Sequence, residues 1–261
     1  MPIVTVLEKL YGSGSPDILE RKYSSLCRGL KVNLEFAGTI ERGWVQIDVS
    51  GEDETAALSF LDREIGLAPV SSLKVSKFSV LRGKVVFSGK NENELLVDLG
   101  VFSPKVYDAV LPVQRLRAQL AEGKDFPLQK LVELFCLYDN FPLEVKIIQD
   151  SKEDQEKTVE ARLSEEQVSL FSSWVRSRFD RLIVLGGLFS DVERIVKLSR
   201  HYRDIIRLES LGTLEQVIFC KLGTDAVGLI PKLGRFLPDT VLIPFSPKKI
   251  LEAVDSHSFN W

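Results

Sequence analysis

The sequence predicts an α+β protein with a ferredoxin-like domain at 1–75, an OB-like five-stranded barrel at 76–163 and a second ferredoxin-like domain at 164–261. Segment order is the first reason, because both ends of the chain read as strand, helix, two strands and helix. The middle third reads as three strands, a helical connection and two strands, which is the order of an OB barrel. With 261 residues, the chain is long enough for several cores.

The first domain begins with a β-branched strand at 3–8 and a helix at 18–30 with one apolar face. Strands at 32–36 and 44–49 follow, and in the second of these Trp44, Gln46 and Asp48 alternate with apolar residues. This alternation predicts a sheet with one wet face, on which Trp44 would lie. A helix that opens with acidic residues at 52–54 and stops at Gly66 follows, and a short fourth strand is expected at 73–75.

The middle domain has strand patterns at 78–88, 95–99 and 106–111, short helices at 113–120 and 128–137, and a hairpin formed by 143–149 and 158–163. Such barrels bind single strands by a basic groove with exposed aromatic residues. The alternative is a rigid spacer whose aromatic residues belong to the core. The candidate groove residues are Arg82, Lys84, Phe87, Lys90, Lys105 and Tyr107.

The third domain starts at a capping-box pattern, Ser164 to Gln167. A buried strand at 182–185, a helix to about 201 and strands at 203–209 and 214–221 follow. A short helix after the turn at 223–225, ended by Pro231 and Gly234, a strand at 240–244 and a helix at 247–254 complete the domain. The pattern therefore repeats the βαββαβ order of the first domain.

A basic stripe marks this domain, because Arg194, Lys197 and Arg200 recur at helical spacing and Arg203 follows three residues later. Arginine forks and lysines placed in this way can contact phosphates. The alternative is a solvated helix face whose cations pair with nearby acidic residues such as Asp191.

The turn at 220–225 joins a strand to a short helix and has three interpretations. Gly223 and Thr224 could place a phosphate at the helix N-terminus. Cys220 could be a nucleophile activated by Lys221, or the segment could be only a structural corner. The candidate nucleic-acid or phosphate contacts of the domain are Arg194, Lys197, Arg200, Arg203, Lys221, Thr224, Lys232 and Arg235.

Composition narrows the class of protein. The net charge is −3, and it divides into −3 for 1–75, −1 for 76–163 and +1 for 164–261, so any nucleic-acid site must be a local patch. Three separated cysteines favour a reducing cytoplasm, and no run approaches the ~20 apolar residues of a membrane span. Neither Walker A nor a zinc-ligand spacing occurs, so we expect no catalytic residue, metal or cofactor.

Several runs resemble an archaeal conserved hypothetical family built on a domain of unknown function: 203–212 (RDIIRLESLG), 220–231 (CKLGTDAVGLIP), 97–100 (VDLG), 111–112 (LP) and 116–120 (LRAQL). The resemblance covers nearly the whole chain. It implies an archaeal cytoplasmic protein and no particular reaction.

We expect an RNA- or ribonucleoprotein-binding accessory factor in translation or transcription, without catalysis, by analogy with the uses of these folds. The alternative is an enzyme that binds a nucleotide or phosphorylated small molecule at the turn 223–225. The acidic first domain could also take a protein partner, and no membrane association is expected.

Overall fold

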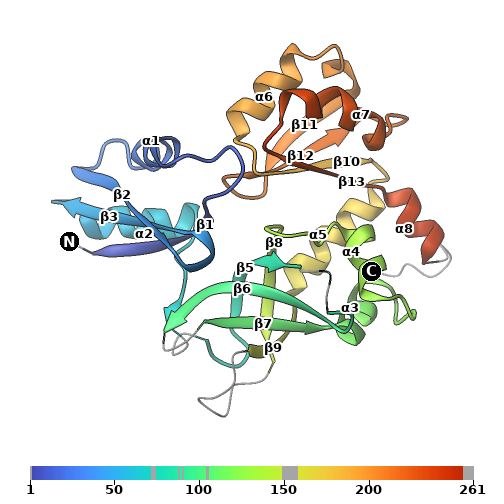
Figure 1. The fold of residues 1–261 in the computed structure, drawn as a ribbon, viewed down its shortest axis with the longest axis horizontal. Coiled ribbons are helices and arrows are strands. Elements are labelled where there is room, and N and C mark those ends of the chain that lie inside the picture. Colours follow the sequence, from blue (N-terminus) through green and yellow to red (C-terminus); the bar gives the residue numbers. More distant parts are fainter. Residues whose placement is uncertain are drawn as a thin grey trace.

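The computed structural model describes residues 2–71, 75–87, 89, 91–103, 106–148 and 158–254. Within these residues the chain forms three sheets of three, six and four strands, with helices packed on each (Figure 1). The α+β class predicted from the sequence is confirmed.

The first sheet consists of β1 (Ile3–Lys9), β2 (Val32–Ile40) and β3 (Trp44–Gly51) in the antiparallel order β1-β3-β2. An isolated antiparallel bridge from Val6 to Leu67 adds to the open side of β1. The helices α1 (Pro16–Leu26) and α2 (Glu54–Glu64) bury Leu19, Tyr23 and Leu61 against the sheet. The 3-10 turn η1 (Glu41–Gly43) joins β2 to β3.

The second sheet contains β4 (Val70–Ser71), β5 (Val80–Val86), β6 (Glu94–Ser103), β7 (Tyr107–Pro112), β8 (Pro142–Ile147) and β9 (Thr158–Leu163). Its order is β4-β6-β5-β8-β9-β7, and β6 also pairs with β7, so the pairings of five strands form a closed ring. Within the ring only β7 and β9 run parallel. The helices α3 (Val113–Leu120) and α4 (Leu128–Phe135) lie between β7 and β8 in the chain.

The third sheet has the antiparallel order β11-β12-β10-β13, formed by β10 (Arg181–Leu185), β11 (Ile205–Ser210), β12 (Glu215–Cys220) and β13 (Val241–Phe245). The helices α6 (Phe189–Leu198) and α7 (Ala226–Leu233) cover one face, where Val192 and Leu229 pack on Leu182. Two 3-10 turns, η3 (Tyr202–Asp204) and η4 (Gly234–Phe236), end these helical segments.

The other face of the third sheet shares its core with the second sheet. Ile183, Val217 and Phe245 belong to the same buried cluster as the core residues of the second sheet, and this cluster includes residues of α5 (Glu165–Arg176) and α8 (Pro247–Ala253). Trp174 of α5 packs edge-on against Phe171 and Phe245. The second and third sheets are therefore held together by a continuous apolar core.

The start of α5 confirms the predicted cap, because Ser164 Oγ accepts a hydrogen bond from the Gln167 N–H at 3.0 Å. The Gln167 side chain does not complete the capping box. Its Oε1 accepts from the Glu144 N–H at 3.1 Å and ties α5 to β8.

The loop that follows β1 contacts the loop that follows β10, and the contact is made by Gly12 and Gly186. Gly12 has a φ of +60°, and a Cβ there would lie 2.5 Å from the backbone of Gly186. Ser13 donates from both N–H and Oγ to the Gly186 carbonyl at 2.8 Å. The turn at 12–14 is thus a contact between domains, which needs glycine because a side chain would not fit.

The prediction that Trp44 lies on a solvent-exposed face of β3 is wrong. It is fully buried, and its Nε1 donates to Asp98 Oδ2 of β6 at 3.0 Å. The alternation in β3 is real, but β6 of the second sheet covers this end of the strand. No helix among the described residues has the length and apolarity to cross a membrane.

Candidate functional site

The eight predicted phosphate contacts of the third domain divide between the two ends of its sheet. Lys221 N–H donates to the Asp204 carbonyl at 2.8 Å, so Arg203 and Lys221 lie at the same end. The helix α7 begins near this end and runs toward the opposite end of the sheet. Because an α-helix rises about 1.5 Å per residue, Lys232 in its last turn lies about one helix length away from Lys221. Lys232 and Arg235 therefore lie at the opposite end and do not join Lys221.

Two cations of the stripe on α6 have partners on their own helix. Arg194 pairs with Asp191 at 3.1 Å, and Lys197 pairs with Glu193 at 2.8 Å. These are exposed pairs of neighbouring turns, which matches the solvated-face alternative for these two residues. Arg200 and Arg203 lie beyond the helix and are exposed, without an ion-pair partner among the described residues.

Lys221 and Thr224 line a hollow of about 540 Å³ at their end of the sheet. Three segments meet there: the corner between α5 and β10, the turn between β12 and α7, and the start of α8. Four cations line it, namely Arg178, Lys221, Lys248 and Lys249. Of these, Arg178, Lys221 and Lys249 have exposed side chains and no ion-pair partner within the described part of the chain.

The acidic residues of this hollow already have internal partners. Asp225 accepts from the Val227 N–H at 2.9 Å, and Asp180 accepts from Ser246 Oγ at 3.2 Å and from the Ala226 N–H at 3.5 Å. Glu252 pairs with Lys248 at 3.8 Å. Two carboxylates thus occupy the N-terminus of α7, so a phosphate would meet cationic side chains here and not the helix N–H groups predicted to hold it.

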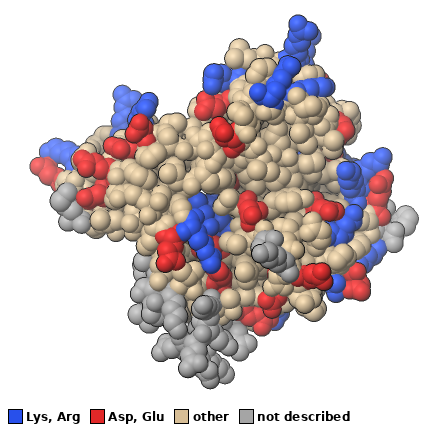
Figure 2. Space-filling view, in the orientation of Figure 1, with Lys and Arg blue, Asp and Glu red and all other residues tan. Residues whose placement is uncertain are grey.

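Exposed apolar side chains lie among the cations at this end. Leu198 and Leu222 are both 78% exposed, and Tyr202 is 56% exposed. They alternate along the chain with Arg200, Arg203 and Lys221. Lys and Arg atoms are visible over the outer end of the third domain, near α6 and α7 (Figure 2). We call the surface formed by Arg178, Arg200, Tyr202, Arg203, Lys221, Lys248 and Lys249 the basic end.

Cys220 does not fit the nucleophile interpretation. The side chain is fully buried, and burial, followed by the charges of Asp180 and Asp225, raises the pKa of its thiol to about 12. A thiolate is therefore disfavoured at neutral pH. Cys220 packs in the core beneath α7 as an apolar residue.

Of the six groove residues predicted for the middle third of the chain, the four that the structure describes do not assemble on one surface. Lys84 is buried and pairs with Glu215 of β12 at 2.6 Å, and Tyr107 is also buried. Phe87 packs partly against the core, while Arg82 is exposed and pairs with Glu144 at 3.3 Å. Lys90 and Lys105 lie outside the described residues.

The sequence did not single out the junction where the three sheets meet. There Glu215 of the third sheet contacts both Lys84 of β5 and the Tyr11 hydroxyl, in the segment that follows β1. Nearby, Glu8 accepts from the Tyr23 hydroxyl and lies 3.7 Å from Lys22 Nζ, which donates to Thr213 at 2.6 Å. The sequence does carry a signal for this junction, namely charged residues within otherwise apolar strand patterns. Such residues indicate buried ion pairs, because charged groups are buried only where they have partners.

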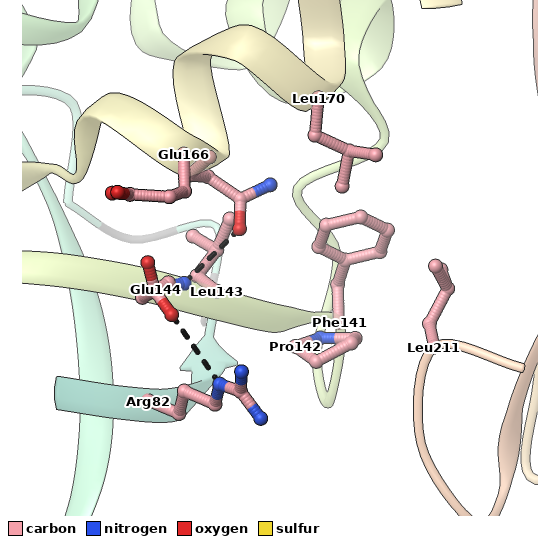
Figure 3. Close-up of a pocket in the computed structure, with 9 residues that line it drawn as sticks. Arg82, Phe141, Pro142, Leu143, Glu144, Glu166, Leu170 and Leu211 are labelled. Atoms are coloured by element: carbon pink, nitrogen blue, oxygen red, sulfur yellow. Dashed lines mark hydrogen bonds and ion pairs between the residues drawn. The ribbon is translucent and has the colours of Figure 1, made fainter.

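Two hollows lie against this junction. The first is about 320 Å³ and largely apolar; it lies between β8, the start of α5 and Leu211, beside the Arg82–Glu144 pair (Figure 3). The second is about 330 Å³ and is lined by charged side chains that include Glu8, Lys22 and Lys84. Burial is the largest effect on Glu8 and raises the pKa of its carboxyl group.

A second buried network joins the first domain to β6 and β7. Lys9 Nζ lies 2.7 Å from Asp98 Oδ2, and the Gly100 N–H donates to Asp98 Oδ1 at 3.0 Å. Arg42 pairs with Asp108 at 2.7 Å. Burial lowers the pKa of Lys9, against the opposing effect of Asp98. These contacts cover part of β6 and β7.

The fold and its surfaces define a three-sheet α+β protein with buried ion pairs between its sheets and a basic hollow on its third sheet. Residues 3–70 match the DUF2110 N-terminal domain, and residues 179–243 match the DUF2110 C-terminal domain. The chain therefore belongs to the DUF2110 family, which confirms the resemblance to a family of domains of unknown function. No curated protein matches the chain.

Proposed function

We propose that the protein is an RNA- or ribonucleoprotein-binding accessory factor in translation or transcription, and that RNA phosphates bind at the basic end. The observation that supports this most directly is the hollow of about 540 Å³ in which Arg178, Lys221 and Lys249 are exposed without ion-pair partners in the described chain. Cationic side chains that the fold does not pair are available to a polyanion. The archaeal origin and cytoplasmic location implied by the resemblance belong to the same proposal.

Tyr202 and the neighbouring arginines suit single-stranded RNA. Single strands are bound by cations that follow the backbone and by aromatic rings on which bases stack. Tyr202 lies between Arg200 and Arg203 in the chain, and its side chain is more than half exposed. Arginine can also bind phosphate through two parallel hydrogen bonds.

The strand orders support the same proposal by analogy. The ring β5-β6-β7-β9-β8 has the pairing expected for an OB-like barrel, and the third sheet has the order expected for a ferredoxin-like domain. In the first sheet, the bridge to Leu67 lies where a fourth ferredoxin-like strand would pair. Both fold types often bind nucleic acid, although a fold does not determine a function.

The alternative function is an enzyme that binds a nucleotide or a phosphorylated small molecule at the turn 223–225. Its support is that Gly223 and Thr224 line the same hollow. It is the weaker proposal, because Asp180 and Asp225 already accept from the first N–H groups of α7.

The test measures the affinity of a fluorescent single-stranded RNA of about ten nucleotides for the full chain at several salt concentrations. We expect Lys221→Glu combined with Lys249→Glu to weaken binding at least about tenfold and to flatten the salt dependence, by about 0.7 in log–log slope for each phosphate that the variant no longer neutralises. Lys232→Glu combined with Arg235→Glu is the matched control, with the same change in charge at the opposite end of α7. Absence of RNA binding by the wild type, or equal loss in both double variants, would contradict the proposal.

The same proteins separate the two functions. A nucleotide site at 223–225 predicts a saturable rise in melting temperature with a nucleoside phosphate, which Lys221→Glu would abolish. RNA binding at the basic end predicts that nucleoside phosphates compete weakly and give no saturable rise.

A further inference from the structure

One buried arginine, Arg181 at the start of β10, has no acidic partner among the described residues. Only 2% of the residue is exposed to solvent. Burial, followed by the charge of Arg207, lowers the pKa of its guanidinium to about 10, so the group still keeps its proton at neutral pH. A positive charge inside the fold is costly unless hydrogen bonds and neighbouring groups compensate for it, so the contacts of Arg181 indicate what the charge is used for.

The guanidinium of Arg181 lies against three aromatic rings. Its Cζ atom is 5.1 Å from the ring centre of Trp174, 4.6 Å from that of Phe219 and 5.7 Å from that of Phe245. These rings come from α5, β12 and β13, and all three belong to the core shared by the second and third sheets. Cation–π attraction therefore stabilises the charge, and the packed rings restrict the orientation of the guanidinium.

The hydrogen-bond donors of Arg181 are directed at the corner between α5 and β10. Nη1 donates to the Trp174 carbonyl at 3.0 Å and to the Phe179 carbonyl at 2.7 Å, and Nη2 donates to Ser177 Oγ at 2.8 Å. Ser177 and Phe179 are the neighbours of Arg178 in the chain. One guanidinium thus holds the chain on both sides of Arg178.

Arg178 is the residue of the basic end that this corner carries. It lines the hollow of about 540 Å³, and its side chain is exposed. Its φ is +58°, a left-handed conformation that is uncommon for a residue other than glycine. Such a conformation costs free energy and persists only where the surrounding contacts maintain it. The hydrogen bonds from Arg181 to both neighbours are contacts of this kind.

We infer that Arg181 is a positioning residue of the RNA site at the basic end, because its guanidinium fixes the corner at 177–180 that presents Arg178 to phosphate. The inference rests on the proposed function. Arg181 does not line the hollow, so it acts through Arg178 and not by contact with RNA. A corner that is already fixed reduces the conformational entropy lost on binding, so the affinity depends on the corner as well as on the charge that it carries.

The test is a double-mutant cycle on RNA affinity, measured with the fluorescent single-stranded RNA of about ten nucleotides. Arg178→Ala should weaken binding at least about fivefold, because one phosphate contact is lost. Arg181→Lys keeps the positive charge but loses the planar fork, and we expect it to weaken binding by a similar factor. The variant that combines both changes should bind no more weakly than Arg178→Ala alone, because Arg181 acts only through Arg178.

Arg117→Lys is the matched control. The Arg117 guanidinium is also partly buried and also holds a backbone carbonyl, that of Phe126 at 2.6 Å, but it belongs to α3. RNA affinity should be unchanged in this variant. If Arg181→Lys does not fold, as judged by circular dichroism, Ser177→Ala removes one acceptor of the guanidinium. It should cause a smaller loss of affinity, which should likewise disappear in the Arg178→Ala background.

The outcomes separate this inference from the function on which it rests. Absence of RNA binding by the wild type would contradict the proposed function, and the inference with it. Binding by the wild type together with unchanged affinity of Arg181→Lys, or with losses that multiply in the combined variant, would overturn the inference alone.

Discussion

Lys84 and Lys221 look alike in the sequence but occupy opposite environments in the fold. Lys84 lies within β5 and Lys221 directly follows β12, and the sequence predicts that both face nucleic acid. The Lys84 side chain is 4% exposed and lies 2.6 Å from Glu215, whereas Lys221 is exposed at the basic end with no ion-pair partner within the described residues. The first cation serves the junction of the domains, and the second is available to a ligand.

The comparison of these two lysines shows that the role of a cationic side chain depends on whether a segment distant in the sequence places an acidic partner beside it. A buried charge must keep its partner, and removal of one partner leaves an uncompensated charge in the interior. An exposed charge contributes little to stability and can be changed freely. Stability and binding measurements should therefore separate the junction from the basic end.

The largest effect is expected at Glu215. Glu215→Ala should lower the free energy of unfolding by about 3–5 kcal/mol, because Lys84 would be buried without a counter-charge. Tyr11 would also lose its acceptor. Urea denaturation measures the loss, and Lys221→Ala is the matched control, with an expected change within about 0.5 kcal/mol. Similar small changes in both variants would remove the distinction between the two regions.

A smaller loss is expected at Asp98. Asp98→Asn should cost about 2–3 kcal/mol, because the Lys9 ammonium loses its carboxylate while most of the geometry is retained. The Trp44 indole reports the change, since its N–H donates to the same carboxylate oxygen. A stable variant with an unchanged tryptophan fluorescence spectrum would show that this network does not hold the first sheet on the second.

The pH dependence of the unfolding free energy should report the raised pKa of Glu8. Burial raises the pKa of Glu8 in the folded protein, so the protonated form is favoured by folding. Its contribution is fully present below the unfolded pKa and is lost as the pH rises through the folded pKa. The unfolding free energy of Glu8→Gln relative to wild type should therefore increase from about pH 4 to pH 8. A difference that is constant over this range, or that falls with pH, would contradict the assignment.

The smallest effect is expected on α6. Arg194→Ala removes an exposed pair with Asp191 and should change stability by less than about 0.5 kcal/mol. The same variant should retain most of its RNA affinity, because Arg194 lies outside the basic end. A decrease in RNA affinity comparable to that of Lys221→Glu would extend the binding surface along the helix.

Local patterns predicted most of the secondary structure. The alternation at 44–49 corresponds to β3, and the capping pattern at 164–167 corresponds to the start of α5. These signals are local, so they can be read from neighbouring residues. The parallel pairing of β7 with β9, the shared core of the second and third sheets and the burial of Trp44 all depend on distant segments.

The site was predicted less completely for the same reason. Arg203 and Lys221 were recognised as cations, but their separation from Lys232 and Arg235 follows from the antiparallel sheet. Arg178 and Lys249 were missed because they come from a corner and a helix that the fold brings to the hollow. Glu215 was missed because its partner lies in another domain.

Hydrogen exchange with and without single-stranded RNA tests the proposed division of roles most directly. We predict that RNA increases amide protection at 199–207, 221–225 and 246–252, which contain every residue of the basic end except Arg178, and leaves 80–86 and 210–216 at the junction unchanged. Protection confined to the junction or to the strands of the second sheet, with none at the basic end, would contradict the account.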